Sequence, residues 1–284
     1  MTKEIANQFF EGERPLFGLH DANIKNTTFG QGESPLKESQ NINIESTIFK
    51  WKYPLWYSKH ITMKDSVFET VAHAGVWYTH DLLFENCAIQ AGKNFRRCSD
   101  ITLRHVHMSS AKETLWTCDN VVLDHVQASG QYFGMNSSNL KINNLNLIGN
   151  YAFDGAKNIE VHDSMLVTKD AFWNCENVTI YNSTINGEYF GWNSKNITLI
   201  NCTVESDQGF CYMDNIKLKN CNLLRTDLAF EYCSNIDASI NSDIMSVKNS
   251  ISGTIKAKSI GKIILEKDKI DPSKTTIITE DKSI

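Results

Sequence analysis

Aliphatic and polar residues alternate in short stretches that return at a nearly constant interval along the chain. Four such stretches align without gaps at about 19 residues, and they begin at Asp119, Lys157, Glu176 and Lys195. In each, an alternation of the NITL kind predicts one strand, a TIN or TVE stretch predicts a second, and a segment with an inward aromatic or aliphatic residue predicts a third. Because each strand would stack on its own copy one turn later, the repeat predicts a parallel β-helix.

Two columns of polar residues mark the bends of each predicted turn. One column contains Asn41, His60, Asp81, Asp100, Asn120, Asn139, Asn158, Asn177, Asn196, Asn215 and Asn235. The other contains Asn26, Asp65, Asn86, His105, His125, Asn144, Asp163, Asn182, Asn201 and Asn220. A stacked amide can donate to one neighbour and accept from the other, and Asn tolerates the left-handed backbone of a sharp bend. We therefore predict asparagine ladders on the inside of the turns.

The register fixes the expected extent of the solenoid. Pro15-Leu16, Pro35-Leu36 and Pro54-Leu55 share one column, so we expect the β-helix to span residues 15–253. It would hold about twelve coils of roughly 19–21 residues, each with three short strands. Residues 1–14 are expected to cap the open end, with apolar side chains on an amphipathic turn. Residues 254–284 are expected to form degenerate last strands and a C-terminal tail.

The repeated N-I-x-L-x-N-C/S-x-I pattern resembles that of the pectin-lyase-like right-handed parallel β-helix proteins. Over almost the whole chain it is similar to an uncharacterised bacterial family of that superfold. The resemblance implies an all-β, single-stranded right-handed parallel β-helix. It implies little about activity, because this fold hosts polysaccharide lyases, glycoside hydrolases, esterases, epimerases and non-catalytic binding proteins. The polygalacturonase-type signatures NTD, GHG and RIK and an Asp-Asp pair are missing.

The outward column of the predicted third strand carries five of the six tryptophans. The residue two places earlier is usually small, so the indoles would form a wall above a low floor. Sugar rings could stack there, at about 1 kcal/mol per contact. Stacked aromatic residues can equally stabilise a sheet as cross-strand pairs or form a self-association surface, and the sequence leaves both interpretations open. The predicted ligand-binding residues are Trp56, Trp77, Lys93, Arg96, Trp116, Trp173 and Trp192.

Charged residues interrupt this row, which a purely structural ladder would not need. Glu113, Asp154 and Asp170 are the candidate catalytic carboxyl groups for acid or base chemistry. Lys93, Arg96 and Arg97 could bind an acidic sugar or stabilise a developing anion. The leading hypothesis is a protein that binds or processes a carbohydrate along this face, and an enzyme would be of the polysaccharide lyase or glycoside hydrolase type. The alternative is a non-enzymatic structural or interaction module that uses the face for self-association.

Charge and hydropathy narrow the classes of protein to which the chain can belong. The net charge of -5, with both signs mixed along the chain, gives no basic surface for nucleic acid. The N-terminus lacks the basic-then-apolar order of a secretory signal, and no apolar run approaches the roughly 18 residues of a membrane span. We therefore expect a cytoplasmic protein with no membrane or nucleic-acid partner. The partners expected at the tryptophan-rich face are an oligosaccharide or a second copy of the chain.

Histidines and cysteines do not point to a metal or cofactor. His105 and His125 occupy ladder positions, where an imidazole can replace Asn as donor and acceptor, and this interpretation is favoured over metal ligation. The eight cysteines include no CxxC pair, so we expect reduced, buried thiols. The sequence therefore predicts no metal site and no cofactor.

Overall fold

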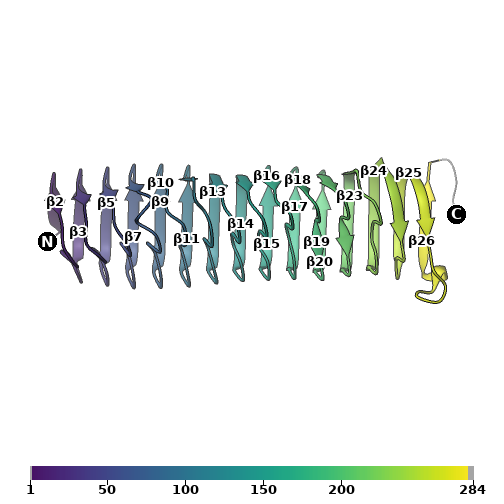
Figure 1. Cartoon of the computed structure of the whole chain (residues 1–284), viewed down its shortest axis with the longest axis horizontal. Coiled ribbons are helices and arrows are strands. Elements are labelled where there is room, and N and C mark those ends of the chain that lie inside the picture. The colour runs from purple at the N-terminus through teal and green to yellow at the C-terminus, as the bar shows by residue number, and fades with distance from the viewer. Residues whose placement is uncertain (1, 281–284) are drawn as a thin grey trace. The chain divides into compact units, whose positions relative to one another are not determined.

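The structure is a computed structural model that describes residues 2–280. The chain divides into two compact units, Met1–Ile148 and Gly149–Ile284. Within each unit the chain winds through successive coils whose strands lie side by side (Figure 1). Residue 1 of the predicted cap and residues 281–284 of the predicted tail lie outside the described residues.

Each coil of the first unit begins with a strand that pairs in parallel with its copy in the next coil. The first strands are β1 (Lys3–Ala6), β3 (His20–Lys25), β5 (Gln40–Glu45), β7 (Lys59–Lys64), β9 (His80–Glu85), β11 (Ser99–Arg104), β13 (Asp119–Ser129) and β14 (Ser138–Ile148). Short second strands follow in most coils: β2 (Phe9–Phe10), β4 (Thr28–Phe29), β6 (Ile48–Phe49), β8 (Val67–Phe68), β10 (Ala88–Ile89) and β12 (His107–Met108). The second strand is merged into β13 and β14, which pair in parallel along both stretches.

The second unit repeats the arrangement. Its first strands are β15 (Lys157–His162), β17 (Glu176–Tyr181), β20 (Lys195–Ile200), β23 (Asp214–Leu224), β24 (Ser234–Lys248), β25 (Gly253–Ile264) and β26 (Thr275–Thr279). Its second strands are β16 (Met165–Val167), β18 (Thr184–Gly187) and β21 (Thr203–Ser206), and a third-strand pair is formed by β19 (Gly191–Trp192) and β22 (Phe210–Cys211). A short 3-10 helix, η1 (Pro272–Lys274), precedes β26.

The predicted all-β, single-stranded right-handed parallel β-helix is confirmed. Counted by first strands, the described residues hold eight coils in the first unit and seven in the second, somewhat more than the twelve or so predicted. The extra coils lie at the ends. Lys3 pairs opposite Ala22 in parallel register, so residues 3–10 form a coil and not an amphipathic turn. After residue 253, β25 and β26 continue the parallel pairing. No helix among residues 2–280 is long and apolar enough to cross a membrane.

The interior is filled by aliphatic side chains of the first strands and by stacked phenylalanines. In the second unit the phenylalanines belong to the segment between the second strand and the next first strand, which we call the third segment. Neighbouring rings there lie 4.9–5.5 Å apart, and all are fully buried: Phe153, Phe172, Phe190, Phe210 and Phe230. The predicted inward aromatic position of the third segment is therefore confirmed as core.

The third segments are mostly bends and not strands. Each coil contains residues with positive φ at the corners, such as Tyr53, Tyr57, His60 and Asp65 in one coil of the first unit. Pairing between third segments is reduced to isolated bridges, as between Trp77 and Arg96, and to the short pair β19 and β22. Left-handed residues interrupt the extended backbone that a continuous strand needs.

The asparagine ladders are present, but they lie on the outside of the corners. Asn177 Nδ2 donates to Asn158 Oδ1 at 2.9 Å, and Asn196 Nδ2 donates to Asn177 Oδ1 at 2.8 Å. These residues have left-handed backbones, as predicted, but their side chains are exposed. The expectation of ladders inside the turns was wrong, because the left-handed corner directs these side chains away from the core.

This exposure sets the expected cost of breaking a ladder. Asn177→Gly removes two exposed hydrogen bonds but tolerates the φ of 59°, so we expect a loss below about 1 kcal/mol. Asn177→Ala removes the same bonds and adds about 1–2 kcal/mol of left-handed strain. Chemical unfolding of both variants measures the difference. Equal stability of the two variants would contradict a left-handed backbone at this corner.

The eight cysteines are all buried and free. Several belong to a column of small residues whose hydroxyl or thiol groups donate to a carbonyl of the preceding coil. Ser194 Oγ donates to the Phe172 carbonyl at 2.6 Å, and Cys175 Sγ donates to the Phe153 carbonyl at 2.9 Å. Burial raises the pKa of the Cys211 thiol to about 12, which keeps it protonated. The thiols of this column therefore act as small core residues that also satisfy buried carbonyls.

Candidate functional site

The outward column of the first unit forms a continuous stack. Trp56 and Trp77 lie parallel with ring centroids 5.1 Å apart, and the Arg96 guanidinium carbon lies 4.7 Å from the Trp77 centroid and 4.5 Å from that of Trp116. We call these four residues the indole–guanidinium stack. Each indole N–H donates to a carbonyl of the following coil, at distances of 2.5–2.7 Å. Because the facing ring surfaces cover one another, this stretch has the geometry of a stabilising ladder.

Glu113 lies beside this stack and is shared by three cations. Its carboxylate is 3.1 Å from Arg96 Nη2, 3.6 Å from Lys93 Nζ and 3.9 Å from Lys112 Nζ. Its side chain is 18% exposed. Three cations on one carboxylate orient Arg96 for stacking and leave a surplus of positive charge. In this setting Glu113 acts as a counter-ion, and its geometry does not support the predicted role in acid or base chemistry.

The second unit brings together the other two candidate carboxyl groups. Asp170 lies three residues before Trp173, is 6% exposed and makes no ion pair with a described residue. Burial raises the pKa of Asp170, and the negative charges of Glu188 and Asp154 raise it further, whereas the Lys169 ammonium lowers it. Asp154 accepts a hydrogen bond from Asn174 Nδ2 at 3.2 Å.

We call Asp154, Asp170, Glu188, Lys169 and Tyr189 the carboxylate cluster. Lys169 Nζ lies 3.3 Å from Glu188 Oε2, and burial followed by the charge of Glu188 raises the pKa of Tyr189. The cluster therefore contains three carboxyl groups and one ammonium group. Sequence reasoning missed Glu188, Lys169 and Tyr189, although Tyr189 occupies the same position of its coil as Asp170, which was the available signal.

Close backbone contacts hold the two coils of this cluster together. A side chain at Gly187 would place its Cβ 1.8 Å from the Thr168 carbonyl oxygen, so only glycine fits there. The Tyr189 N–H donates to the Lys169 carbonyl at 2.8 Å, and residues 170 and 189 form a parallel bridge. The segment that follows β18 is therefore fixed against Asp170, and this contact buries the carboxyl group.

The tryptophans of the second unit are arranged differently from those of the first. Trp192 is 36% exposed and stacks on Tyr212 at 5.1 Å, whereas Trp173 meets Tyr151 only at a tilt of 38° and 6.4 Å. No ring contact joins Trp173 to Trp192 among the residues that the structure describes. Trp173 therefore meets its ring neighbour at a tilt and not in a parallel stack, and it follows Asp170 by three residues in the chain.

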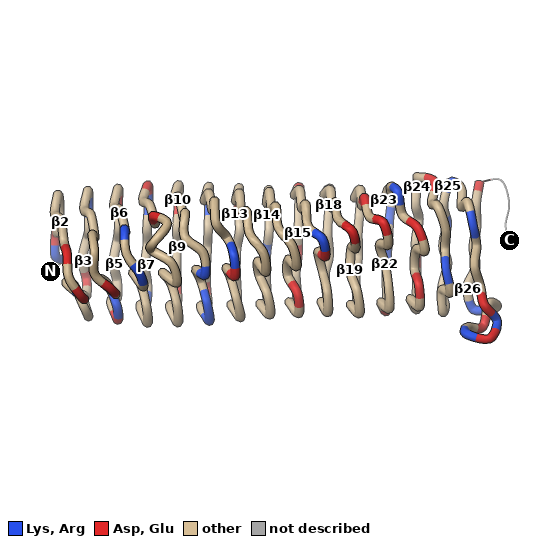
Figure 2. Tube along the Cα trace, viewed as in Figure 1, with Lys and Arg blue, Asp and Glu red and all other residues tan. Residues whose placement is uncertain are grey.

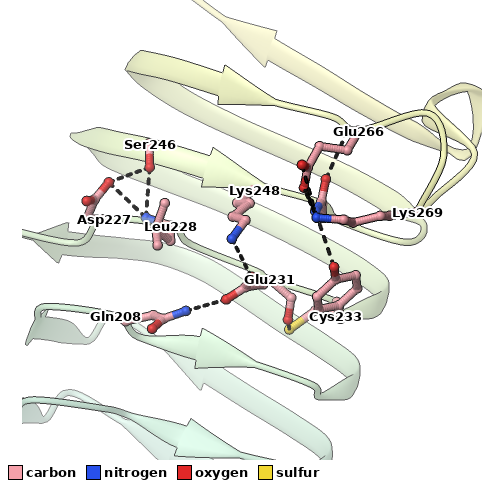
Figure 3. Close-up of polar contacts among 11 residues, drawn as sticks. Gln208, Asp227, Leu228, Glu231, Cys233, Ser246, Lys248, Glu266 and Lys269 are labelled. Carbon is pink, nitrogen blue, oxygen red and sulfur yellow. Dashed lines mark hydrogen bonds and ion pairs between the residues drawn. The ribbon is translucent and has the colours of Figure 1, made fainter.

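Farther along the same column the polar groups are fully paired. Glu231, 14% exposed, accepts from Gln208 Nε2 at 2.6 Å and lies 2.8 Å from Lys248 Nζ (Figure 3). In the same view Glu266 and Lys269 form an ion pair at 2.9 Å. Since both oxygens of Glu231 are occupied, this carboxylate has a structural role, and the candidate site ends before it.

The two ladder histidines form an exposed pair of rings. His105 and His125 stack at 5.0 Å, and His125 Nδ1 lies 2.8 Å from Asp124 Oδ1. No group of three or more metal-ligating side chains is found among residues 2–280. The stacked rings occupy the positions that amides hold in neighbouring coils, which agrees with the interpretation of these histidines as ladder substitutes.

Comparison with known proteins places the chain in a family. The model of a family described as a protein of unknown function, DUF3737, matches residues 3–278. The chain belongs to this family. No curated protein matches this DUF3737 member.

Solved structures with a similar fold are distant from this DUF3737 member. The A-module of the mannuronan C-5 epimerase AlgE4 from Azotobacter vinelandii is 8% identical, with a TM-score of 0.46 over 85% of this chain and 91% of that one. An exopolygalacturonase from Thermotoga maritima is 8% identical, with a TM-score of 0.37 over 99% and 85%. PfbA, a surface adhesin of Streptococcus pneumoniae, is 10% identical, with a TM-score of 0.38 over 77% and 71%. At these values the likenesses carry no argument about a substrate.

Proposed function

We propose that the protein binds a neutral carbohydrate on the outer face of the second unit, at Trp173, Trp192 and the carboxylate cluster. The observation that carries the proposal is Asp170, a carboxyl group that is 6% exposed, has no ion-pair partner among the described residues and precedes the half-buried Trp173 by three residues. Burying a carboxyl group without a cation costs stability, and carboxyl groups with perturbed pKa values cluster at functional sites. Sugar rings offer both an apolar face for an indole and hydroxyl groups for carboxylates.

The charge of this face selects the class of sugar. Asp154, Asp170 and Glu188 are balanced by one cation, Lys169. A uronic acid would bring a further negative charge against them, at an unfavourable Coulomb energy. A neutral sugar avoids this repulsion, so we place neutral oligosaccharides first.

The two aspartates could also process the bound sugar. The raised pKa of Asp170 suits a group that delivers a proton to the glycosidic oxygen as the bond to the anomeric carbon breaks. The Asp154 carboxylate would accept a proton from the water whose oxygen adds to that carbon. One water is consumed per bond, and the two carboxyl groups then exchange a proton with solvent to return to their starting states.

The test is a tryptophan-fluorescence titration with neutral oligosaccharides, followed by analysis of the same samples for cleavage. We expect a saturable shift that Trp173→Ala weakens at least tenfold, because the principal stacking surface is lost. Trp56→Ala, in the self-covered stack of the first unit, is the matched control and should retain binding. Equal loss in both variants, or no saturable shift with any neutral sugar, would overturn the proposal.

One observation favours the alternative function, a non-enzymatic module that uses the third-segment face for self-association. In the first unit the predicted ligand-binding residues Trp56, Trp77, Arg96 and Trp116 cover one another. The Lys93 ammonium group forms an ion pair with Glu113. A surface of this kind presents ring edges and cations, which suits contact with a protein better than stacking on a sugar.

A further inference from the structure

The third segments of the two units differ in their balance of charge. In the first unit, the two third segments between residues 11 and 39 contain four Glu against two cations, whereas those between residues 50 and 137 contain six Lys and Arg residues against two Glu. In the second unit, the third segments between residues 149 and 233 contain six Asp and Glu residues against two cations. Figure 2 shows these charges on the segments that connect the strands of each unit. The balance of charge therefore reverses between one set of third segments and the other.

The positive charges of the first unit exceed their local partners. Arg96, Lys93 and Lys112 share the single carboxylate of Glu113. Arg97 lies over the Tyr78 ring at 5.9 Å and makes no ion pair with a described residue. Next to it, Tyr57 and Tyr78 stack at 4.8 Å, and Tyr57 is 48% exposed. The surface thus presents a local surplus of positive charge, with Arg97 outside any ion pair of the described residues, beside open aromatic rings.

The second unit presents the complementary surface. Asp154 and Asp170 have no cation within ion-pair distance among the described residues, and Glu188 is paired only with Lys169. Exposed rings accompany them, since Trp192 stacks on Tyr212, which is 46% exposed. Aromatic residues are enriched at protein interfaces, and complementary charges across an interface steer association.

We propose that the cationic third-segment face of one copy binds the acidic third-segment face of a second copy. The occupant is a second copy because both charge patterns belong to the same chain and share one repeat. Neighbouring coils of a β-helix recur at about 4.8 Å, so the cations on the two neighbouring third segments of Lys93 and Lys112 can meet the carboxylates on two neighbouring third segments of the second unit without a change of register. The contact joins two different surfaces and is therefore heterologous.

This pairing uses charges that the proposed carbohydrate site also uses, but it does not depend on that function. Asp154 and Glu188 would face the partner copy in the assembly and the sugar in the complex. Bound sugar and assembly would then compete. A protein that assembles but binds no sugar would disprove the proposed function and leave the pairing intact.

Sedimentation velocity of the full chain tests the pairing. We expect association in about 20 mM salt and a monomer in about 500 mM salt, because exposed ion pairs are screened over a shorter distance as salt rises. The double variant Lys93→Glu with Arg97→Glu should weaken association at least tenfold, and so should Glu188→Lys. Lys141→Glu changes an exposed cation on a first strand, and it is the matched control that should associate normally.

Mixing the variants separates pairing from misfolding. The Lys93→Glu, Arg97→Glu variant has lost its cationic face, and the Glu188→Lys variant has a weakened acidic face. Each variant alone should therefore associate weakly. Both should retain the β-sheet circular dichroism of the native chain. The wild-type cationic face remains in the Glu188→Lys chain and the wild-type acidic face remains in the other, so a mixture should recover association. A monomer in low salt, association that survives both reversals, or a mixture that does not recover would overturn the proposal. Milder Lys93→Gln and Arg97→Gln changes provide the same test if the reversals unfold the chain.

Discussion

Phe190→Ala is expected to lower the free energy of unfolding by about 3–5 kcal/mol. The Phe190 ring is fully buried between Phe172, at 5.5 Å, and Phe210, at 4.9 Å, in the phenylalanine column of the second unit. Truncation removes the ring's transfer free energy and leaves a cavity that neighbouring coils cannot close, because their backbones are fixed by parallel pairing.

Urea unfolding followed by circular dichroism measures this loss. Phe190→Leu, which keeps much of the volume, is the control and should cost less than half as much. Trp192→Ala, two residues away but on the outward side, should cost less than Phe190→Ala because its ring is partly exposed. A loss below about 1 kcal/mol for Phe190→Ala would contradict a close-packed column.

Asp170→Asn is expected to abolish sugar processing while making the protein more stable at neutral pH. As a general acid, Asp170 would contribute about 10²–10⁴-fold to the rate, and the amide cannot deliver that proton. Burial raises the pKa of Asp170 above its value in the unfolded chain, so the folded state binds the proton more tightly. Stability therefore falls as pH rises from the unfolded pKa through the folded pKa.

The amide cannot ionise, so the variant avoids this loss. Its stability should exceed that of the unaltered protein above the folded pKa of Asp170, and the difference should vanish below the ordinary pKa of an aspartate. Unfolding curves at several pH values measure both limits. Asp207→Asn changes an exposed carboxylate paired with Arg225 and is the control, with no stabilisation expected. A destabilising effect of Asp170→Asn at neutral pH would show that the charge supports the fold.

The fold could be predicted from the sequence because each coil repeats the same local chemistry. The column that contains Asn177 predicted a left-handed corner, and the inward position of Phe172 predicted a core residue. Whether the amides face inward or outward could not be deduced from their period. That depends on the direction of Cα–Cβ at a left-handed residue, which the one-dimensional pattern does not contain.

The site was predictable only in part. Arg96 reads as an interruption of the tryptophan row, but in the structure it continues the row, because a guanidinium group stacks on Trp77 and Trp116 as a third indole would. Asp154 was identified from the outward column, and Asp170 from its closeness to that column in the sequence. The environment that sets the pKa of Asp170 could not be predicted, since it depends on how closely the segment after Gly187 packs against the preceding coil.

The most direct test of the carbohydrate site is a pH titration of the aspartate side-chain carboxyl carbons by nuclear magnetic resonance, with and without a neutral oligosaccharide. We expect one resonance, absent in Asp170→Asn, to titrate at a higher pH than an ordinary aspartate and to shift when the sugar is added. An Asp170 resonance that titrates in the usual range and is unmoved by every sugar would contradict a carbohydrate site at this face.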